Sequence, residues 1–170
     1  MLKNLLVASL ALLGTVHIAS AHYISKATLT CPTGIKGSLL FDDPHKGYVA
    51  VTVEFTNLVA DERYNYFIDD HAVPADGDCS KTGNLFDPTK KYKDPNNYSC
   101  TADKASKCAK GDLTGRGGVL VGKGIGQTTT LTWHDTQLAL RGTNGINGKS
   151  VVIYNGSRKL ILCANIEKVQ

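Results

Sequence analysis

Several classes of protein are excluded by features that this 170-residue chain does not have. Lys and Arg form no cluster or stripe, and a net charge of +4 is too small to predict binding to nucleic acid. Charged residues make up only 20% of the chain and apolar residues 42%, which excludes a disordered protein. Beyond the N-terminus no stretch is rich in Ala, Glu and Leu, and 17 glycines argue further against a helical bundle or coiled coil.

Motifs of several enzyme classes are missing as well. The chain has no Gly-x-Ser-x-Gly elbow, no HExxH motif and no Walker loop. No two cysteines have Cys-x-x-Cys spacing, which argues against a zinc ribbon or a thioredoxin motif. Adjacent acidic residues such as Asp69 and Asp70 point to opposite faces of a strand, so this pair does not form a hydrolase dyad by itself.

The first 21 residues have the pattern of a secretory signal. A single cation, Lys3, precedes an apolar run over residues 5–13, and Ala19-Ser20-Ala21 matches a signal peptidase site. The apolar run is too short to span a bilayer, and the polar C-terminus offers no hydrophobic tail for a lipid anchor. We therefore expect cleavage after residue 21 and a secreted, extracellular domain over residues 22–170 without a membrane anchor.

All the cysteines lie in this predicted mature domain, where disulfides persist. Their number is odd, so one thiol is left over or pairs between two chains, and the oligomeric state stays open. Cys100 and Cys108 are close enough in sequence to staple a loop. Asn97 and Asn155 each begin an N-glycosylation sequon. The five cysteines are Cys31, Cys79, Cys100, Cys108 and Cys163.

Apolar and polar residues alternate along several short segments. Between residues 48 and 55, Val49, Val51, Val53 and Phe55 occupy every second position, which predicts a strand with one buried face. Clusters of Gly, Pro, Asn and Asp separate the segments, as is typical of an antiparallel sandwich or barrel. The stretch 74–118 is interpreted as one long loop, functional or internally stapled. The other predicted strands cover 26–30, 36–41, 64–69, 128–133, 150–154 and 159–164.

Several loop and strand motifs together resemble the copper/zinc superoxide dismutase family. They are Ala-Asp-Gly-Asp-Cys at 75–79, Thr-Gly-Asn-Leu-Phe-Asp-Pro at 82–88, and later blocks at 111–115, 146–154 and 163–166, in the family's order. The shortened zinc-loop region and the ending most resemble the secreted copper-only branch. The resemblance implies an all-β, eight-stranded Greek-key β-barrel and a disulfide between Cys79 and Cys163. Closing that ~85-residue ring contributes about 4 to 5 kcal/mol in the chain-entropy account.

The resemblance also locates the family's copper ligands. That family holds copper with histidines, because imidazole suits both Cu(II) and Cu(I) during dismutation. Its His-x-His strand pair falls on Phe67 and Asp69, its third His on Leu85 and its fourth on Tyr154. The resemblance therefore implies that all four copper positions are lost. We expect Phe67 and Leu85 to convert the metal pocket into apolar core.

Neighbouring positions of the family pattern have changed too. Among the zinc ligands only Asp112 remains, and Ala109 stands where a His would be. We expect Asp112 alone to bind no metal tightly and to close a turn. The family's channel Arg falls on Leu160, and Arg158 is the nearest arginine in the sequence.

These replacements predict a superoxide-dismutase-like protein that has lost catalysis. It would hold no cofactor and act as a binding or structural module toward an unknown extracellular partner. Two copper hypotheses stay open as alternatives. His71 and Asp69, with another His, could form a rearranged dismutase site. His22, once N-terminal, could chelate copper through its amine and imidazole, as in lytic polysaccharide monooxygenases. We expect exposed or structural roles for His45 and His134.

Overall fold

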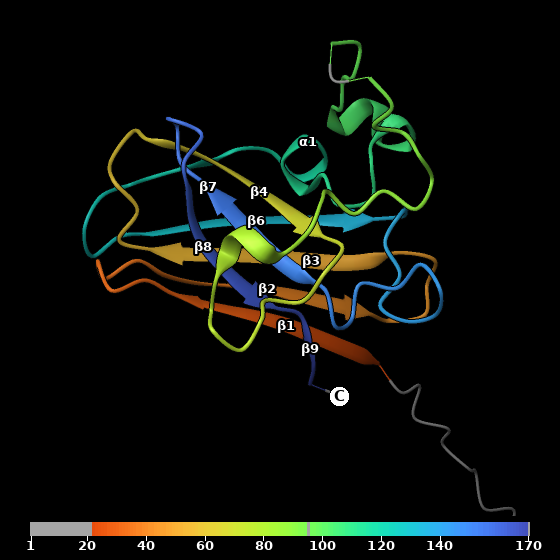
Figure 1. Ribbon diagram of the computed structural model, residues 1–170, viewed down its shortest axis with the longest axis horizontal. Coiled ribbons are helices and arrows are strands. Elements are labelled where there is room, and N and C mark those ends of the chain that lie inside the picture. The colour runs from red at the N-terminus through yellow and green to blue at the C-terminus, as the bar shows by residue number, and fades with distance from the viewer. Residues whose placement is uncertain (1–21, 95, 170) are drawn as a thin grey trace, which may run out of the picture.

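The structure is a computed structural model that describes residues 22–94 and 96–169, and the predicted secretory signal at 1–21 lies outside these residues. Two antiparallel sheets make up most of it (Figure 1). The strands are β1 (Tyr23–Thr30), β2 (Lys36–Asp43), β3 (Val49–Thr56), β4 (Arg63–Asp69), β5 (Leu120–Val121), β6 (Thr128–Asp135), β7 (Ser150–Tyr154), β8 (Leu160–Asn165) and β9 (Glu167–Lys168).

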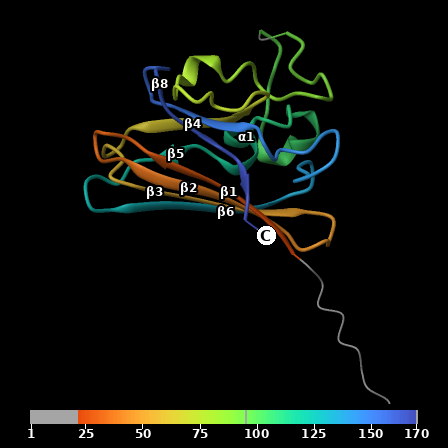
Figure 2. The same ribbon diagram turned by 60° about the horizontal axis from the view of Figure 1, so that its bottom comes forward.

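The sheets stack as two layers (Figure 2). One sheet has the strand order β6-β3-β2-β1-β9, and the other has the order β5-β4-β7-β8. The predicted all-β class is therefore confirmed in its main feature. The described residues form nine strands, whereas the resemblance implies eight. Seven of them match the predicted segments, and β5 and β9 are two-residue pairings that no periodic pattern reveals. No described backbone pairing joins the two sheets, so barrel closure and Greek-key order stay predictions.

The core lies between the two layers and follows the predicted alternation. On β3, every second side chain from Val49 to Phe55 is at most 2% exposed. The facing sheet contributes Tyr64, Tyr66 and Ile68 of β4, each at most 1% exposed. Because side chains alternate across a strand, the other residues of β4 must point away from this core. That outer face of β4 forms the floor of the site described below.

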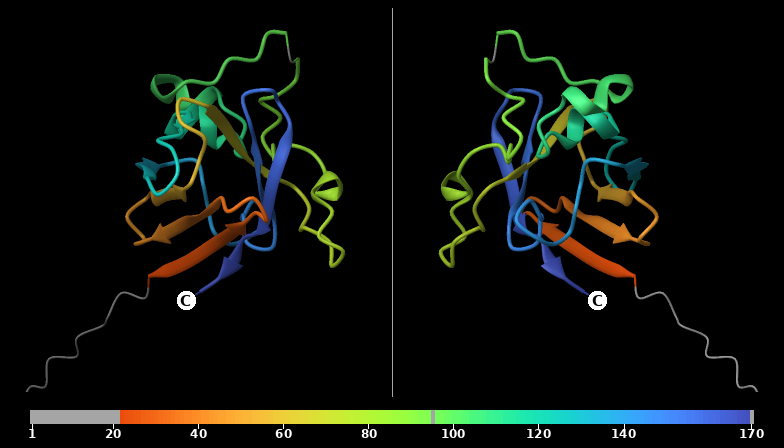
Figure 3. Two further views of the ribbon diagram at one scale, coloured as in Figure 1. Left: turned by 90° about the vertical axis from the view of Figure 1, so that its left-hand side faces the viewer. Right: turned by 90° about the vertical axis from the view of Figure 1, so that its right-hand side faces the viewer.

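The long segment over residues 74–118 covers the outer side of the four-stranded sheet (Figure 3). It was predicted to be a loop, yet it contains three short helical elements. They are the 3₁₀ helices η1 (Cys79–Lys81) and η2 (Ala102–Lys107) and the helix α1 (Leu113–Gly117). Local caps account for two of them, η1 and α1: the Asp78 carboxylate accepts from Ser80 N, and Asp112 accepts from Gly115 N. Short helices of this kind have too few residues to produce a recognisable helical period.

Two disulfides fix this segment. Cys79–Cys163 ties η1 to β8, and Cys100–Cys108 closes an eight-residue separation within the segment, so both predicted pairings are confirmed. Cys31 is free and half-buried. Its sulfur accepts a hydrogen bond from Thr33 Oγ1 at 3.1 Å, which lowers the pKa of the thiol. Whether Cys31 also pairs between chains stays open, and comparing non-reducing with reducing electrophoresis answers it.

Within residues 22–94 and 96–169, no helix is both long and apolar enough to cross a membrane.

Candidate functional site

A pocket of about 670 Å³ opens on the outer face of the four-stranded sheet. Its floor comes from β4 and β7, and its walls come from the long segment over residues 74–118. Pockets of this size are typical of small-molecule sites. The lining residues are Asn65, Phe67, Asp69, Gly83, Asn84, Leu85, Tyr92, Tyr98, Cys100, Asp112, Thr114, Gly115 and Tyr154.

Backbone pairing holds the walls against β4. Two isolated bridges set Leu85 opposite Asp69 and Asp112 opposite Phe67. Ile68 between them donates its N–H to Gly111 O at 2.8 Å, and its carbonyl accepts from Phe86 N at 2.8 Å. The loop residues are therefore positioned by strand-like hydrogen bonds rather than by side-chain contacts alone.

Two rings form one side of the pocket. Phe67 of β4 and Tyr154 of β7 lie edge to face, with ring centroids 6.0 Å apart. In the ladder Tyr154 pairs with Asn65 on one side and with Leu160 on the other, next to a register irregularity after Ile153. The prediction that Phe67 and Leu85 become apolar core is wrong, because both are half-buried and line open space.

Asp69 lies at the end of β4 and is 7% exposed. Its carboxylate accepts one side-chain hydrogen bond, from Thr82 Oγ1 at 2.7 Å. Burial raises the pKa of Asp69, and the Thr82 hydrogen bond offsets part of that rise. Burial together with the nearby Asp69 raises the pKa of Tyr154. The pocket floor thus combines a desolvated carboxylate with a protonated phenol.

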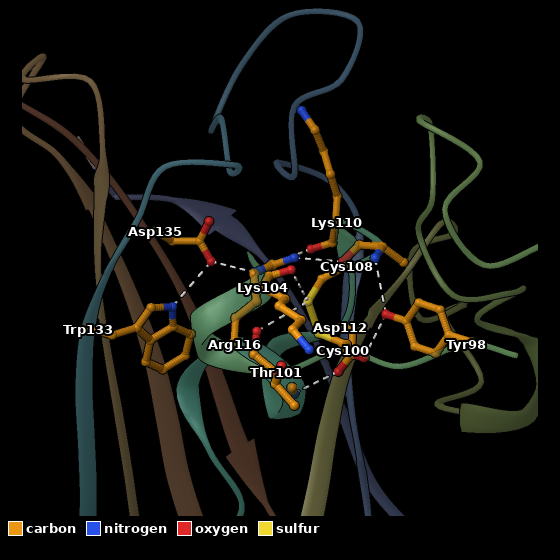
Figure 4. The surroundings of a disulfide bond; sticks show 12 residues. Tyr98, Cys100, Thr101, Lys104, Cys108, Lys110, Asp112, Arg116, Trp133 and Asp135 are labelled. Carbon is orange, nitrogen blue, oxygen red and sulfur yellow. Dashed lines mark hydrogen bonds and ion pairs between the residues drawn. A yellow bond between two sulfur atoms is a disulfide. The ribbon is translucent and has the colours of Figure 1, made fainter. Parts of the chain in front are cut away.

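Asp112 closes a turn, as predicted, and also begins α1. Its carboxylate accepts from Gly115 N at 2.8 Å and from Tyr98 Oη at 2.7 Å (Figure 4). The same Tyr98 hydroxyl accepts a hydrogen bond from Ala109 N at 3.0 Å. Tyr98 therefore bridges the two positions that the family resemblance assigns to zinc ligands. Sequence reasoning missed Tyr98, and its only signal was its place beside Cys100.

A buried ion pair lies behind this wall. Arg116 of α1 donates from Nε to the Asp135 carboxylate at 2.6 Å, and their side chains are 2% and 0% exposed (Figure 4). Trp133 Nε1 donates to the same carboxylate at 3.2 Å. Asp135 faces inward, whereas the neighbouring His134 is exposed and stacks on Tyr48, in agreement with the expected exposed or structural role of His134.

The remaining histidines stay outside the pocket. The His71 side chain is 67% exposed, and its Nε2 lies 3.8 Å from the Asp70 carboxylate. His22 Nδ1 lies 3.1 Å from Asp42 Oδ1 at the start of β1. The His45 ring packs edge-on against Tyr23. Across the described ranges, no three His, Cys, Asp or Glu side chains are grouped so that they could hold a metal ion.

Comparisons with known proteins agree on one family, although no family model matches the chain. The cell surface Cu-only superoxide dismutase 5 of Candida albicans is 29% identical, over 97% of this chain and 71% of the relative. The cell surface Cu-Zn superoxide dismutase 4 of the same organism is 27% identical, over 94% and 68%. A solved mutant of the Candida albicans superoxide dismutase 5 matches with a TM-score of 0.71 and 26% identity, covering 89% and 92%.

The chain is similar in sequence and in fold to the copper/zinc superoxide dismutase family. Within this dismutase homologue, the positions that the resemblance assigns to copper all line one pocket: Phe67, Asp69, Leu85 and Tyr154. Arg158 does not replace the channel arginine there. It lies in the turn between β7 and β8 with a positive φ of 59°, and it is not a lining residue.

The two sequons of this dismutase homologue lie in loops. Asn97 donates from its amide to Asp94, and Asn155 accepts from Lys159 N at 2.9 Å in the β7–β8 turn. Glycosylation at Asn97 and Asn155 stays a prediction.

Proposed function

We propose that this protein is a secreted dismutase homologue that has lost copper-dependent dismutation and acts through binding. The observation that carries the proposal is the composition of the pocket. Its described lining includes no His, and phenylalanine, aspartate, leucine and tyrosine occupy the positions where the family resemblance expects copper ligands. The proposal concerns the site, because a shared fold does not transfer an activity.

The donor atoms in the pocket do not suit the copper of a dismutase. The reaction alternates between Cu(II) and Cu(I), and imidazole or sulfur ligands stabilise the reduced state better than carboxylates do. Here the available donors are oxygens: Asp69 and Asp112 carboxylates, tyrosine hydroxyls and amides. The residues present therefore do not fit the family's metal, and no catalytic step is routed through it.

The electrostatics of the pocket also oppose the family's substrate. Superoxide is an anion, and a cleft of one sign attracts ligands of the opposite sign. The described lining has two carboxylates and no Lys, Arg or His. Leu160 stands where the resemblance expects the channel arginine, and it is half-buried beside Tyr154. Both features favour loss of dismutation over a rearranged dismutase site.

Three features support the extracellular setting that we propose. Residues 1–21 have the pattern of a secretory signal, and both curated relatives are named cell-surface proteins. Two disulfides also suit an oxidising compartment. We therefore place the binding function outside the cell.

Metal content tests the loss of the copper site. The purified protein is loaded with excess copper, dialysed against a weak chelator and assayed for metal per chain and for superoxide dismutation. We expect no retained copper and no activity. A positive control replaces all four positions together: Phe67→His, Asp69→His, Leu85→His and Tyr154→His. In this variant, the donor set regains the imidazoles that copper prefers.

About one retained copper per chain in the unmodified protein would overturn the proposal. Two variants then locate the metal. His71→Ala removes it if the rearranged dismutase site exists. One extra residue before His22 removes it if the free N-terminal amine is a ligand, because the amine moves away from the imidazole.

A further inference from the structure

The pocket is negative in a protein that is positive overall. The whole chain carries a net charge of +4, yet the described pocket lining holds Asp69 and Asp112 and no cationic side chain. A concave surface that carries one sign of charge concentrates counter-ions of the other sign. The charge of the pocket therefore points to a cationic ligand, the opposite of the anion that the family acts on.

Of the two carboxylates, Asp69 is the better candidate for the counter-charge of a cationic ligand. It is 7% exposed, no described Lys, Arg or His forms an ion pair with it, and Thr82 donates its one side-chain hydrogen bond. The Asp112 carboxylate, by contrast, already accepts hydrogen bonds from Tyr98 Oη and Gly115 N. A buried carboxylate without a counter-charge is costly, and a bound cation would supply what the protein leaves out.

The walls of the pocket supply the second attraction. Four rings line it in two edge-to-face pairs, Phe67 with Tyr154 and Tyr92 with Tyr98, whose centroids lie 6.0 and 4.8 Å apart. The faces of such rings attract cations. Cation–ring contacts do occur in the described part of the chain, but they involve Tyr23 and Phe86. The four pocket rings are therefore available to a ligand.

We propose that this pocket binds a small organic ammonium ion, with Asp69 as its counter-charge and Phe67 and Tyr154 as an aromatic wall. An organic cation fits better than a metal ion, because no described cluster of metal-ligating side chains exists and the space is about 670 Å³. The inference rests on the proposed loss of the copper site, since histidine-bound copper would occupy the same space.

Choline and its uncharged isostere 3,3-dimethylbutan-1-ol test the charge requirement, because the two probes have similar shape. Each is titrated into the purified protein and followed by calorimetry or by NMR chemical shifts. We expect choline to bind at least about tenfold more tightly, which corresponds to one close charge interaction. Equal affinities would overturn the proposal, and so would the absence of binding by either probe.

Two substitutions assign the binding to the named groups. Asp69→Asn keeps the hydrogen-bond acceptor for Thr82, and it should weaken choline binding about tenfold without changing binding of the isostere. Phe67→Leu keeps apolar bulk but removes the ring, and it should weaken choline binding about threefold. The matched control is Asp61→Asn, an exposed position with a φ of 60° that Asn also tolerates, before the opposite end of β4.

Failure of this inference can be told apart from failure of the proposed function. Copper content is measured on the same preparation. No copper and no choline preference would overturn the ammonium site alone. About one copper per chain would overturn the proposed function as well, whatever the choline titration shows. An unchanged choline affinity in Asp69→Asn would overturn the assignment of the counter-charge.

Discussion

Asp69 and Asp135 are both buried carboxylates, and the protein treats them in opposite ways. Asp135 is 2% exposed and accepts from Arg116, from the Trp133 indole and from the backbone N–H groups of Gln137 and Leu138. Asp69 is 7% exposed and accepts one side-chain hydrogen bond, from a hydroxyl. The surroundings of Asp135 therefore satisfy its charge completely, whereas those of Asp69 do not.

The difference separates a structural carboxylate from one that is available to a ligand. Asp135 and Arg116 hold α1 and the carbonyls of Ala109 and Lys110 in place, since the same guanidinium donates to both carbonyls. Asp69 holds only Thr82 and faces a pocket. A buried carboxylate that lowers stability and lines a pocket is expected where a residue is kept for function at the expense of stability.

Breaking the satisfied pair should have the largest effect on stability. Arg116→Ala leaves Asp135 charged, buried and without its cation, and it removes donors from two carbonyls. Losing one partner of a buried pair costs about 3 to 5 kcal/mol. Urea denaturation followed by circular dichroism measures the loss. Arg63→Ala, at an exposed position on β4, is the control and should change stability by less than about 0.5 kcal/mol. Equal losses in the two variants would contradict the structural role of the pair.

Neutralising the unsatisfied carboxylate of Asp69 should raise stability rather than lower it. Asp69→Asn keeps an acceptor for Thr82 and removes the buried charge, so we expect a gain of about 1 kcal/mol at pH 7. The same urea experiment measures it. A loss of stability would show that the Asp69 charge is satisfied by contacts in the folded protein, and it would remove the contrast with Asp135.

The pH dependence of stability sharpens this result. Burial raises the pKa of Asp69 in the folded protein, so the folded state binds more protons than the unfolded state between the ordinary Asp pKa and the raised value. The contribution of Asp69 to the free energy of unfolding therefore falls as pH rises through that window, and the full penalty remains above it. The difference between Asp69→Asn and the unmodified protein should thus grow with pH across the window and then stay constant.

Much of the fold could be predicted from the sequence, because burial on one side of a strand leaves a period-two pattern. All seven predicted strands exist, with ends that differ by a few residues. The strands β5 and β9 could not be predicted, because each has two residues and forms only through pairing with a neighbour. The short helix α1 depends on the Asp112 cap, a local contact rather than a period.

The residues of the site could be predicted from the sequence, but the presence of an open pocket there could not. Motif order identified Phe67, Asp69, Leu85 and Tyr154, and the structure brings all four around one pocket. That these residues line an open pocket could not be predicted, because side-chain identity alone does not show whether the space of a lost metal site becomes filled by packing. Tyr98 also went unnoticed, since it lies in a segment without periodicity and meets Asp112 only through the folding of that segment.

The smallest expected effect on stability concerns the hydroxyl of Tyr66, a core residue of β4. Among the described residues, Tyr66 Oη is the one buried side-chain polar atom without a hydrogen-bond partner. Removing such a group leaves nothing unpaired, so Tyr66→Phe should leave stability unchanged or raise it by about 0.5 kcal/mol. Tyr98→Phe is the matched control, because its hydroxyl serves both Asp112 and Ala109 N, and its removal should cost about 1 kcal/mol. If Tyr66→Phe were as costly as Tyr98→Phe, the Tyr66 hydroxyl would have a hydrogen-bond partner in solution, and it would not be an unsatisfied group.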